Sequence, residues 1–195
     1  MRRRTGIVSA ILSIVLMAAA PPGPWRYRID PEASGVNARV AFLGLSSKTA
    51  QFPAVMGRLS LPDAATTAPT SAIALDVTLD ARRLQAGDAL TLKRLKGEDF
   101  FDVAHYPTVT FSGETLRMTA GQTAEITGKL TVRGVTRPET LHVTFSEPPA
   151  ETLGSRPIQL TGTMRIDRRA YGMTAWSLVV GRKVDITIRT RMVPS

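Results

Sequence analysis

The residues whose types could support catalysis are two histidines and one short acidic run. His105 precedes a Tyr-Pro pair, and His142 lies at an outward-facing position of an expected strand, so both favour structural roles over acid–base catalysis. Glu98, Asp99 and Asp102 are close enough in sequence to form a carboxylate pair of the glycosidase type. Because they follow an expected helix, capping of backbone N–H groups or contact with water is the simpler role.

No sequence motif for catalysis or metal binding accompanies these residues. The chain contains no G-x-S-x-G, H-E-x-x-H or G-x-x-x-x-G-K-[ST] segment. It has no cysteine, which excludes disulfides, thiolate metal sites and a lipidated cysteine, and two widely spaced histidines make a poor transition-metal site. We therefore expect no catalytic residues, no metal and no cofactor, and a protein that is not an enzyme.

The charge balance is basic but does not indicate a nucleic-acid-binding protein. The chain of 195 residues carries 25 Lys and Arg against 16 Asp and Glu, a formal net charge of +9. Residues 2–4 account for three of these charges, and the other basic residues are scattered without interleaved aromatic residues. With 43% hydrophobic and 21% charged residues, the composition indicates one globular domain with a solvated basic surface and no nucleic acid partner.

The first 20 residues have the composition of a secretory signal peptide. Residues 2–4 are arginines, residues 7–17 form an apolar stretch that is too short to span a membrane, and residues 18–20 are alanines that suit cleavage. We therefore expect residues 1–20 to be removed on export, which leaves no stable membrane span. Pro21 would directly follow the cut, and this unfavourable position leaves an uncleaved anchor as the alternative.

A proline-rich spacer, residues 21–24, leads into a single domain, residues 25–195, whose pattern is that of strands. Residues 73–80 are the clearest example, because Ile, Leu, Val and Leu alternate there with Ala, Asp, Thr and Asp. Similar runs lie at residues 36–42, 52–61, 108–111, 126–132, 141–145, 158–166 and 184–188, and residues 148–157 are an expected loop. Many antiparallel strands with one apolar face each must close to bury that face, which predicts an all-β, antiparallel up-and-down barrel.

One short helix is expected, and an aromatic corner follows it. Asp88 is a suitable N-cap for this helix, and Gly97 is a suitable end. Phe100 and Phe101 are adjacent in the corner, and we expect Phe101 to enter the core while Phe100 lies on the opposite face.

The interior of such a barrel is the remaining place for function. A barrel of about eight strands either fills itself with side chains or holds one slender ligand. The inward positions of the expected strands include Phe42, Phe52, Phe111, Leu130, Met164 and Ile166. These residues suit either a packed core or the lining for an elongated apolar guest, and both interpretations stay open at this point.

Three stretches closely resemble the bacterial YceI-like family. They are residues 95–111, 126–145 and 166–188, and the similarity extends from about Tyr27 to the C-terminus. The shared motifs are Asp99-Phe100-Phe101-Asp102, Tyr106-Pro107, Gly128-x-Leu130-Thr131, Gly134-Val135-Thr136-x-Pro138, and Arg168 followed by Tyr171-Gly172. The resemblance implies a lipocalin-like antiparallel barrel that is exported to the periplasm and binds polyisoprenoid lipids, such as polyprenyl phosphates or quinones.

The chain departs from the family pattern at two histidine positions. Ala33-Ser34 stands where the family has His-Ser, and residues 91–94 read Thr-Leu-Lys-Arg where it has Arg-Asp-x-His. If those histidines hold a polar head group in relatives, this protein must use other groups, such as Arg94 or Arg168, or bind another lipid.

These observations together predict a periplasmic β-barrel that sequesters or carries a long isoprenoid lipid of the polyprenyl phosphate or quinone type. Exposed edge strands would also allow a homodimer. The residues expected to contact the lipid are Phe42, Phe52, Phe101, Tyr106, Phe111, Leu130, Met164, Tyr171 and Trp176, with Arg94 and Arg168 at its head group. The alternative is an envelope stress or interaction protein with a filled barrel and a protein partner.

Overall fold

The computed structural model describes residues 25–62, 69–152, 154 and 156–195, so the expected signal peptide and spacer lie outside the described residues. The strands are β1 (Trp25–Ile29), β2 (Gly35–Phe42), β3 (Ser46–Phe52), β4 (Val55–Leu61), β5 (Thr70–Asp80), β6 (Gln85–Ala86), β7 (Thr108–Ala120), β8 (Thr123–Val132), β9 (Val135–Phe145), β10 (Ile158–Asp167) and β11 (Val180–Pro194). The helices among these residues are α1 (Ala89–Lys96) and α2 (Pro149–Thr152), with 3-10 turns η2 (Ala81–Arg83) and η3 (Arg168–Tyr171). None of them is long and apolar enough to cross a membrane.

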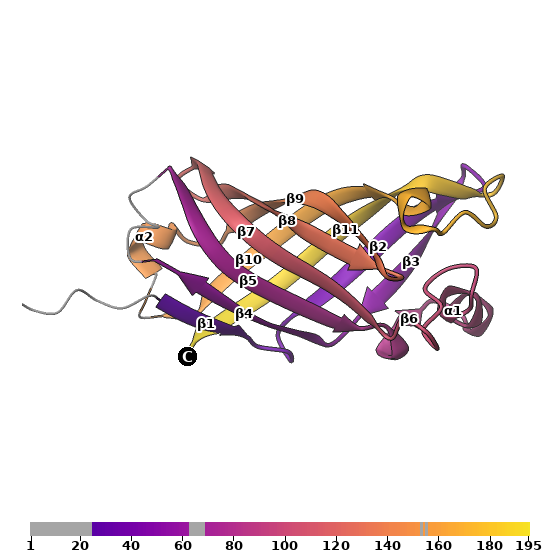
Figure 1. The fold of residues 1–195 in the computed structure, drawn as a ribbon, viewed down its shortest axis with the longest axis horizontal. Helices are drawn as coiled ribbons and strands as arrows, with labels where there is room; N and C mark the ends of the chain where they lie inside the picture. Colours follow the sequence, from indigo (N-terminus) through magenta and orange to yellow (C-terminus); the bar gives the residue numbers. More distant parts are fainter. Residues whose placement is uncertain (1–24, 63–68, 153, 155) are drawn as a thin grey trace, which may run out of the picture.

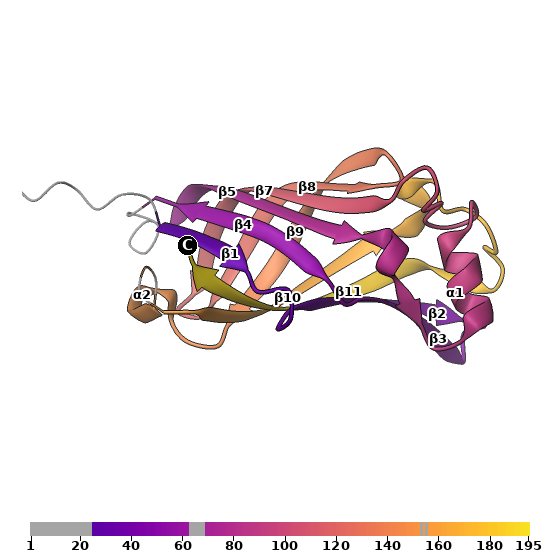
Figure 2. The same ribbon diagram turned by 90° about the horizontal axis from the view of Figure 1, so that it is seen from below.

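Eight strands form a closed barrel in which every strand runs antiparallel to its neighbours (Figure 1). The order around the ring is β1-β4-β5-β7-β8-β9-β10-β11, and β1 closes it by pairing with β11, so that Tyr27 lies opposite Pro194. Figures 1 and 2 place α1 at one end of the elongated barrel and α2 with the C-terminus at the other. The prediction of an all-β, antiparallel up-and-down barrel is confirmed.

The last strand, β11, holds two segments of the wall together. Its first residues pair with β2, and its last residues pair with β1, so β2 and its partner β3 extend the wall toward α1. Arg191 fastens the bend between β1 and β2, because its guanidinium contacts the Asp30 carboxylate at 2.8 Å and its backbone N–H donates to the Ser34 hydroxyl at 3.1 Å. The hydrogen bond from the Arg191 guanidinium to the Asp30 carboxylate, together with the charge of Arg191, lowers the pKa of Asp30.

The inner face of the barrel carries one continuous apolar core. Five of the six residues predicted to face inward belong to it, namely Phe52, Phe111, Leu130, Met164 and Ile166. The sixth, Phe42, is half-buried at the end of β2, beyond the core, where the ammonium of Lys48 lies 5.6 Å from its ring.

The predicted helix and its caps are confirmed, but one detail of the corner after it is not. Asp88 accepts a hydrogen bond from the Thr91 backbone N–H at 2.7 Å, and Gly97 ends the helix. Phe100 is buried rather than on an opposite, outer face. Residues 98–101 form a turn, so the alternation of a strand does not assign faces to Phe100 and Phe101.

Two further segments differ from the prediction. The expected loop at residues 148–157 contains the one-turn helix α2, and Ser46–Phe52 forms a strand where the sequence showed no clear alternation. Its first four residues, Ser46–Thr49, are polar, and only Ala50 and Phe52 at its end enter the core, so its pairing with β2 rather than its own pattern defines it. Pro53 and Ala54 separate it from β4.

A glycine pair lets β7 and β8 approach closely at a bend. Gly113 and Gly128 are register partners, and the pairing shifts just after them. A Cβ atom on Gly128 would lie 2.2 Å from the Ser112 carbonyl oxygen and 2.8 Å from the Gly113 Cα, both of which are backbone atoms.

We predict that Gly128→Ala lowers the free energy of unfolding by about 1–3 kcal/mol, because backbone rather than a flexible side chain must move. Urea denaturation measures this loss. Gly121→Ala, in the turn of the same hairpin, is the control, because no heavy atom lies within 4 Å of its added Cβ. Equal effects of the two changes would contradict the prediction.

Candidate functional site

The interior of the barrel holds a cavity of about 460 Å³. Its lining reaches from Lys48 and Phe100 near α1 to Ala120 and Pro149 at the opposite end. The volume falls within the range of roughly 300–1,000 Å³ that is common for small-molecule sites. The side chains therefore do not fill this barrel.

The inner face of β11 shows where the space lies. Val184, Ile186 and Ile188 point inward at alternate positions and line the cavity, yet all three are only half-buried. Met192, farther along the same face, is buried. Aliphatic side chains that keep accessible surface on an inner wall can gain contacts from an apolar guest.

The few polar groups in the lining are unevenly distributed. Among the described residues that line the cavity, none is acidic and none is a histidine; three are threonines, and the basic ones are Lys48 and Arg168. Lys48 donates to the Asp88 carboxylate at 3.0 Å, beside the start of α1, and the Arg168 guanidinium lies 6.0 Å from the Phe100 ring centroid. Positive charge is thus confined to the α1 end of the cavity.

Arg168 is held in place by backbone oxygens. It is 2% exposed, and its Nε, Nη1 and Nη2 atoms donate to the carbonyls of Gly181, Met173, Ala175 and Val180, with 2.8 Å for the Gly181 and Ala175 bonds. Burial lowers the pKa of Arg168, but a guanidinium stays protonated far above neutral pH.

This arginine leaves a net positive charge beside an apolar cavity. A guanidinium has five N–H donors, and four hydrogen bonds to carbonyl oxygens are present. Within the described part of the chain, no carboxylate forms an ion pair with Arg168. Carbonyl dipoles solvate the charge without neutralising it, so an anionic or strongly dipolar group would be attracted to this end.

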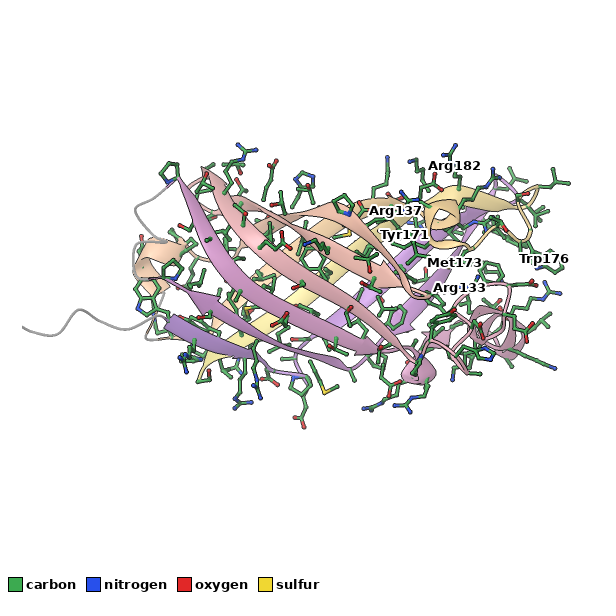
Figure 3. All side chains as sticks on the ribbon, in the orientation of Figure 1. Arg133, Arg137, Tyr171, Met173, Trp176 and Arg182 are labelled. Carbon is green, nitrogen blue, oxygen red and sulfur yellow. The ribbon has the colours of Figure 1, made fainter. Side chains whose placement is uncertain are left out.

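Three side-chain contacts attach η3 to the β8–β9 hairpin (Figure 3). The Tyr171 hydroxyl donates to the Glu139 carboxylate at 2.7 Å, and Arg137 and Arg133 donate to backbone carbonyls in and just after η3, at 2.8 and 3.1 Å. Burial is the main cause that raises the pKa of Tyr171, and the hydrogen bond to Glu139 raises this pKa further. These contacts fix the turn from which Arg168 reaches the cavity.

The wall beside η3 is open between β9 and β10. The two strands pair only where Leu160–Thr163 lie opposite His142–Phe145, and an outer groove of about 700 Å³ follows the unpaired part. Met164 and Ile186 line both this groove and the cavity. The barrel wall is therefore thin at this point.

The family model of the YceI-like domain matches residues 27–192. The chain belongs to the YceI-like family. A UPF0312 protein of Pseudomonas putida is 29% identical over 164 residues, which cover 83% of each chain. A UPF0312 protein of Vibrio cholerae is 30% identical over 169 residues, which cover 85% of each chain.

Solved structures share the YceI-like barrel at lower identity. BcnA of Burkholderia cenocepacia has a TM-score of 0.71 at 21% identity, and the match covers 84% of this chain and 98% of BcnA. A polyisoprenoid binding domain from Saccharophagus degradans has a TM-score of 0.62 at 14% identity, over 87% of this chain and 98% of that domain. At these identities the likeness concerns the fold alone.

Six of the residues expected at the lipid line the cavity of this YceI-like barrel. They are Phe52, Phe101, Phe111, Leu130, Met164 and Arg168. Phe52 and Phe101 meet edge to face with ring centroids 5.6 Å apart, so the corner after α1 closes against the wall from β3.

The other five do not reach the cavity lining. Tyr171 is buried on Glu139, and Trp176 is exposed, with the Arg94 guanidinium 4.5 Å from its ring centroid. Tyr106 is exposed and covers Gly134 in the β8–β9 turn. Phe42, the fifth, lies at the end of β2. Tyr106, Tyr171 and Trp176 lie in loops and turns, so alternation along strands could not place them, and Arg94 lies on α1.

Several lining residues were not among those predicted from the sequence. The inward parity of β11 would have identified Val184, Ile186 and Ile188, because they alternate strictly in the last expected strand. Leu95 shares one face of the expected helix with Leu92 and reaches the lining from α1, whereas no local signal marks Lys48 on β3.

The candidate catalytic residues lie outside the cavity. His105 is exposed and contacts the Asp102 carboxylate at 2.9 Å, which raises the pKa of His105. His142 is also exposed, with Glu125 3.6 Å away. Among the described residues, no group of three His, Asp or Glu side chains could hold a metal ion.

We predict that Arg168→Met lowers the free energy of unfolding by about 2–4 kcal/mol, because two buried and two part-buried carbonyls lose a charged donor. Urea denaturation measures the effect. Arg169→Met is the matched control, because the neighbouring Arg169 side chain is exposed and a change there should stay within about 0.5 kcal/mol. A loss below about 1 kcal/mol for Arg168→Met would show that its four hydrogen bonds to backbone carbonyls do not stabilise the fold.

Proposed function

We propose that this protein binds a long isoprenoid lipid of the polyprenyl phosphate or quinone type in its barrel and sequesters or carries it in the periplasm. The observation that carries the proposal is the cavity, which is unfilled, apolar along its length and basic at one end only. A structural neighbour described as a polyisoprenoid binding domain supports the same ligand class. Export by residues 1–20 is part of the proposal.

The energetics favour such a ligand. Each CH₂ group that leaves water contributes about 0.8 kcal/mol of favourable free energy. The burial of several isoprene units therefore contributes more free energy than immobilising the chain costs. A filled barrel with only a protein partner would offer no such burial. The half-buried Val184 and Ile188 provide surface for these contacts.

The charge distribution orients the ligand. The polar group of the lipid would lie at the α1 end, near Lys48 and Arg168, with the chain extending toward Met192 and the opposite end. Arg168 keeps the head-group role predicted from the sequence, and Lys48 replaces Arg94 in that role. A lipid bound in the reverse sense would place its polar group among apolar side chains, at an unpaired desolvation cost.

The direct test is mass spectrometry of lipids that co-purify with the protein from its own host. We expect an isoprenoid at near-equimolar ratio. Phospholipids alone, or no lipid from native preparations, would contradict the proposal.

We predict that Met164→Trp weakens polyprenol binding to delipidated protein by about tenfold or more, because the larger ring occupies the lipid path. Its cost to the stability of the delipidated barrel should stay below the roughly 1–3 kcal/mol of an overpacked core, since the cavity accommodates the ring. Thr161→Trp, on the outer face of the same strand, is the control. Unchanged affinity together with a large stability loss would exclude Met164 from the binding path.

We further predict that Lys48→Met weakens binding of a polyprenyl phosphate by roughly tenfold while leaving the uncharged polyprenol unaffected, because only the phosphate attracts the ammonium. A titration of delipidated protein with both lipids measures the difference. Lys129→Met, where the lysine pairs with Glu114 on the outer wall, is the control for loss of one charge. Equal losses for both lipids would contradict the proposed orientation.

A further inference from the structure

Exposed apolar side chains gather at the α1 end of the barrel. Leu45 at the tip of the β2–β3 hairpin is 96% exposed, and Leu178, between η3 and β11, is 99% exposed. The described residues expose seven large apolar side chains, and five of them lie in the β2–β3 hairpin tip, in α1 or in the segment between η3 and β11. These five are Leu43, Leu45, Leu90, Trp176 and Leu178. Figures 1 and 2 show the three segments at the same end of the molecule.

Direct contacts join the three segments into one surface. The Leu43 backbone N–H donates to the Val179 carbonyl at 2.7 Å, which ties the hairpin tip to the segment before β11. Trp176, at the far end of Figure 3, stacks on Arg94 of α1 and donates to the Asp99 carboxylate at 3.3 Å. The exposed leucines therefore do not belong to independent loops.

This surface, which we call the α1-end surface, is basic. Residues 42–49, 89–97 and 168–183 contain one, three and four Lys or Arg residues and no Asp or Glu. Lys93, Lys96, Arg169 and Lys183 are four of these residues, and in the described part of the chain none of the four forms an ion pair.

Most carboxylates that flank the surface already have partners. Asp88 caps α1 and pairs with Lys48, Asp99 accepts from Trp176, and Asp167 pairs with Arg182. Glu98 is the flanking carboxylate that has no such partner among the described residues. The charge that remains available at this end is therefore predominantly positive.

We propose that the α1-end surface docks on an anionic lipid bilayer, with Leu45 and Leu178 inserted among the head groups and the unpaired basic residues against lipid phosphates. A bilayer accepts single projecting leucines without a complementary pocket, and basic side chains beside them add electrostatic attraction to anionic lipids. A two-fold contact with a second copy would instead oppose the four unpaired basic residues of one copy to the same four residues of the other.

The polarity of the cavity is consistent with docking at the α1 end. Lys48 and Arg168, the basic residues in its lining, lie at the same end, so a docked barrel would have the polar end of its cavity toward the membrane. Docking is nevertheless a separate property, because the leucines and Lys93 do not line the cavity.

The test is sedimentation of the full mature protein with phosphatidylcholine vesicles that contain or lack phosphatidylglycerol. We expect binding to the anionic vesicles only, and a strong decrease when salt shortens the Debye length from about 10 to about 3 Å. Leu45→Ser combined with Leu178→Ser should weaken binding by roughly tenfold or more, since two leucines leave the interface. Lys93→Gln combined with Lys183→Gln should weaken it and reduce its salt dependence.

Met56→Ser is the matched control, because Met56 is an exposed apolar residue on β4, outside the α1-end surface, and its loss should leave vesicle binding unchanged. Polyprenol titration without vesicles checks each variant, and we expect all of them to bind as the wild type does. A failure of vesicle binding with intact polyprenol binding would overturn docking alone, whereas the reverse result would overturn only the proposed cavity ligand.

Equal binding to neutral and anionic vesicles, or full binding by the double leucine variant, would overturn the proposal. A third outcome would also overturn it: the wild type is a dimer in sedimentation velocity, the double leucine variant is a monomer, and neither protein binds vesicles. The surface would then be a contact between two copies of the chain.

Discussion

The barrel closes because its last strand pairs with two other strands. β11 pairs with β2 along its first part and with β1 at its end, and this arrangement closes the ring. It requires a sharp change of direction between β1 and β2, which Arg191 stabilises through Asp30 and Ser34. Without it, the apolar inner faces of β1 and β11 would remain open to water.

The closed ring explains why there is space inside. An eight-stranded barrel is just wide enough to be filled by large side chains, and here the inner face of β11 carries only aliphatic residues at Val184, Ile186 and Ile188. The aromatic residues Phe52 and Phe101 meet each other at one wall instead of spanning the axis. The interior is thus apolar enough to exclude water from most of its surface, yet too sparsely filled to be a packed core.

The two ends of the barrel have become chemically different. Arg168 is buried at the α1 end on backbone carbonyls, a costly arrangement that the turn after β10 supports through Tyr171 and Glu139. The same turn leads into the segment that carries Leu178. One irregular segment therefore supplies both the positive end of the cavity and part of the outer surface, so changes in it would affect both.

The barrel, the capped helix and the family can all be predicted from the amino-acid sequence, because each depends on local information. Alternation with a period of two places residues on one face of a strand, Asp88 and Gly97 bound α1, and motifs such as Asp99-Phe100-Phe101-Asp102 are contiguous in the chain. The sequence does not show which inward residues surround empty space, or which aromatic residues, such as Trp176, lie outside the barrel. Alternation along a strand gives the direction of a side chain but not its distance from the opposite wall, and turns have no period from which a direction could be inferred.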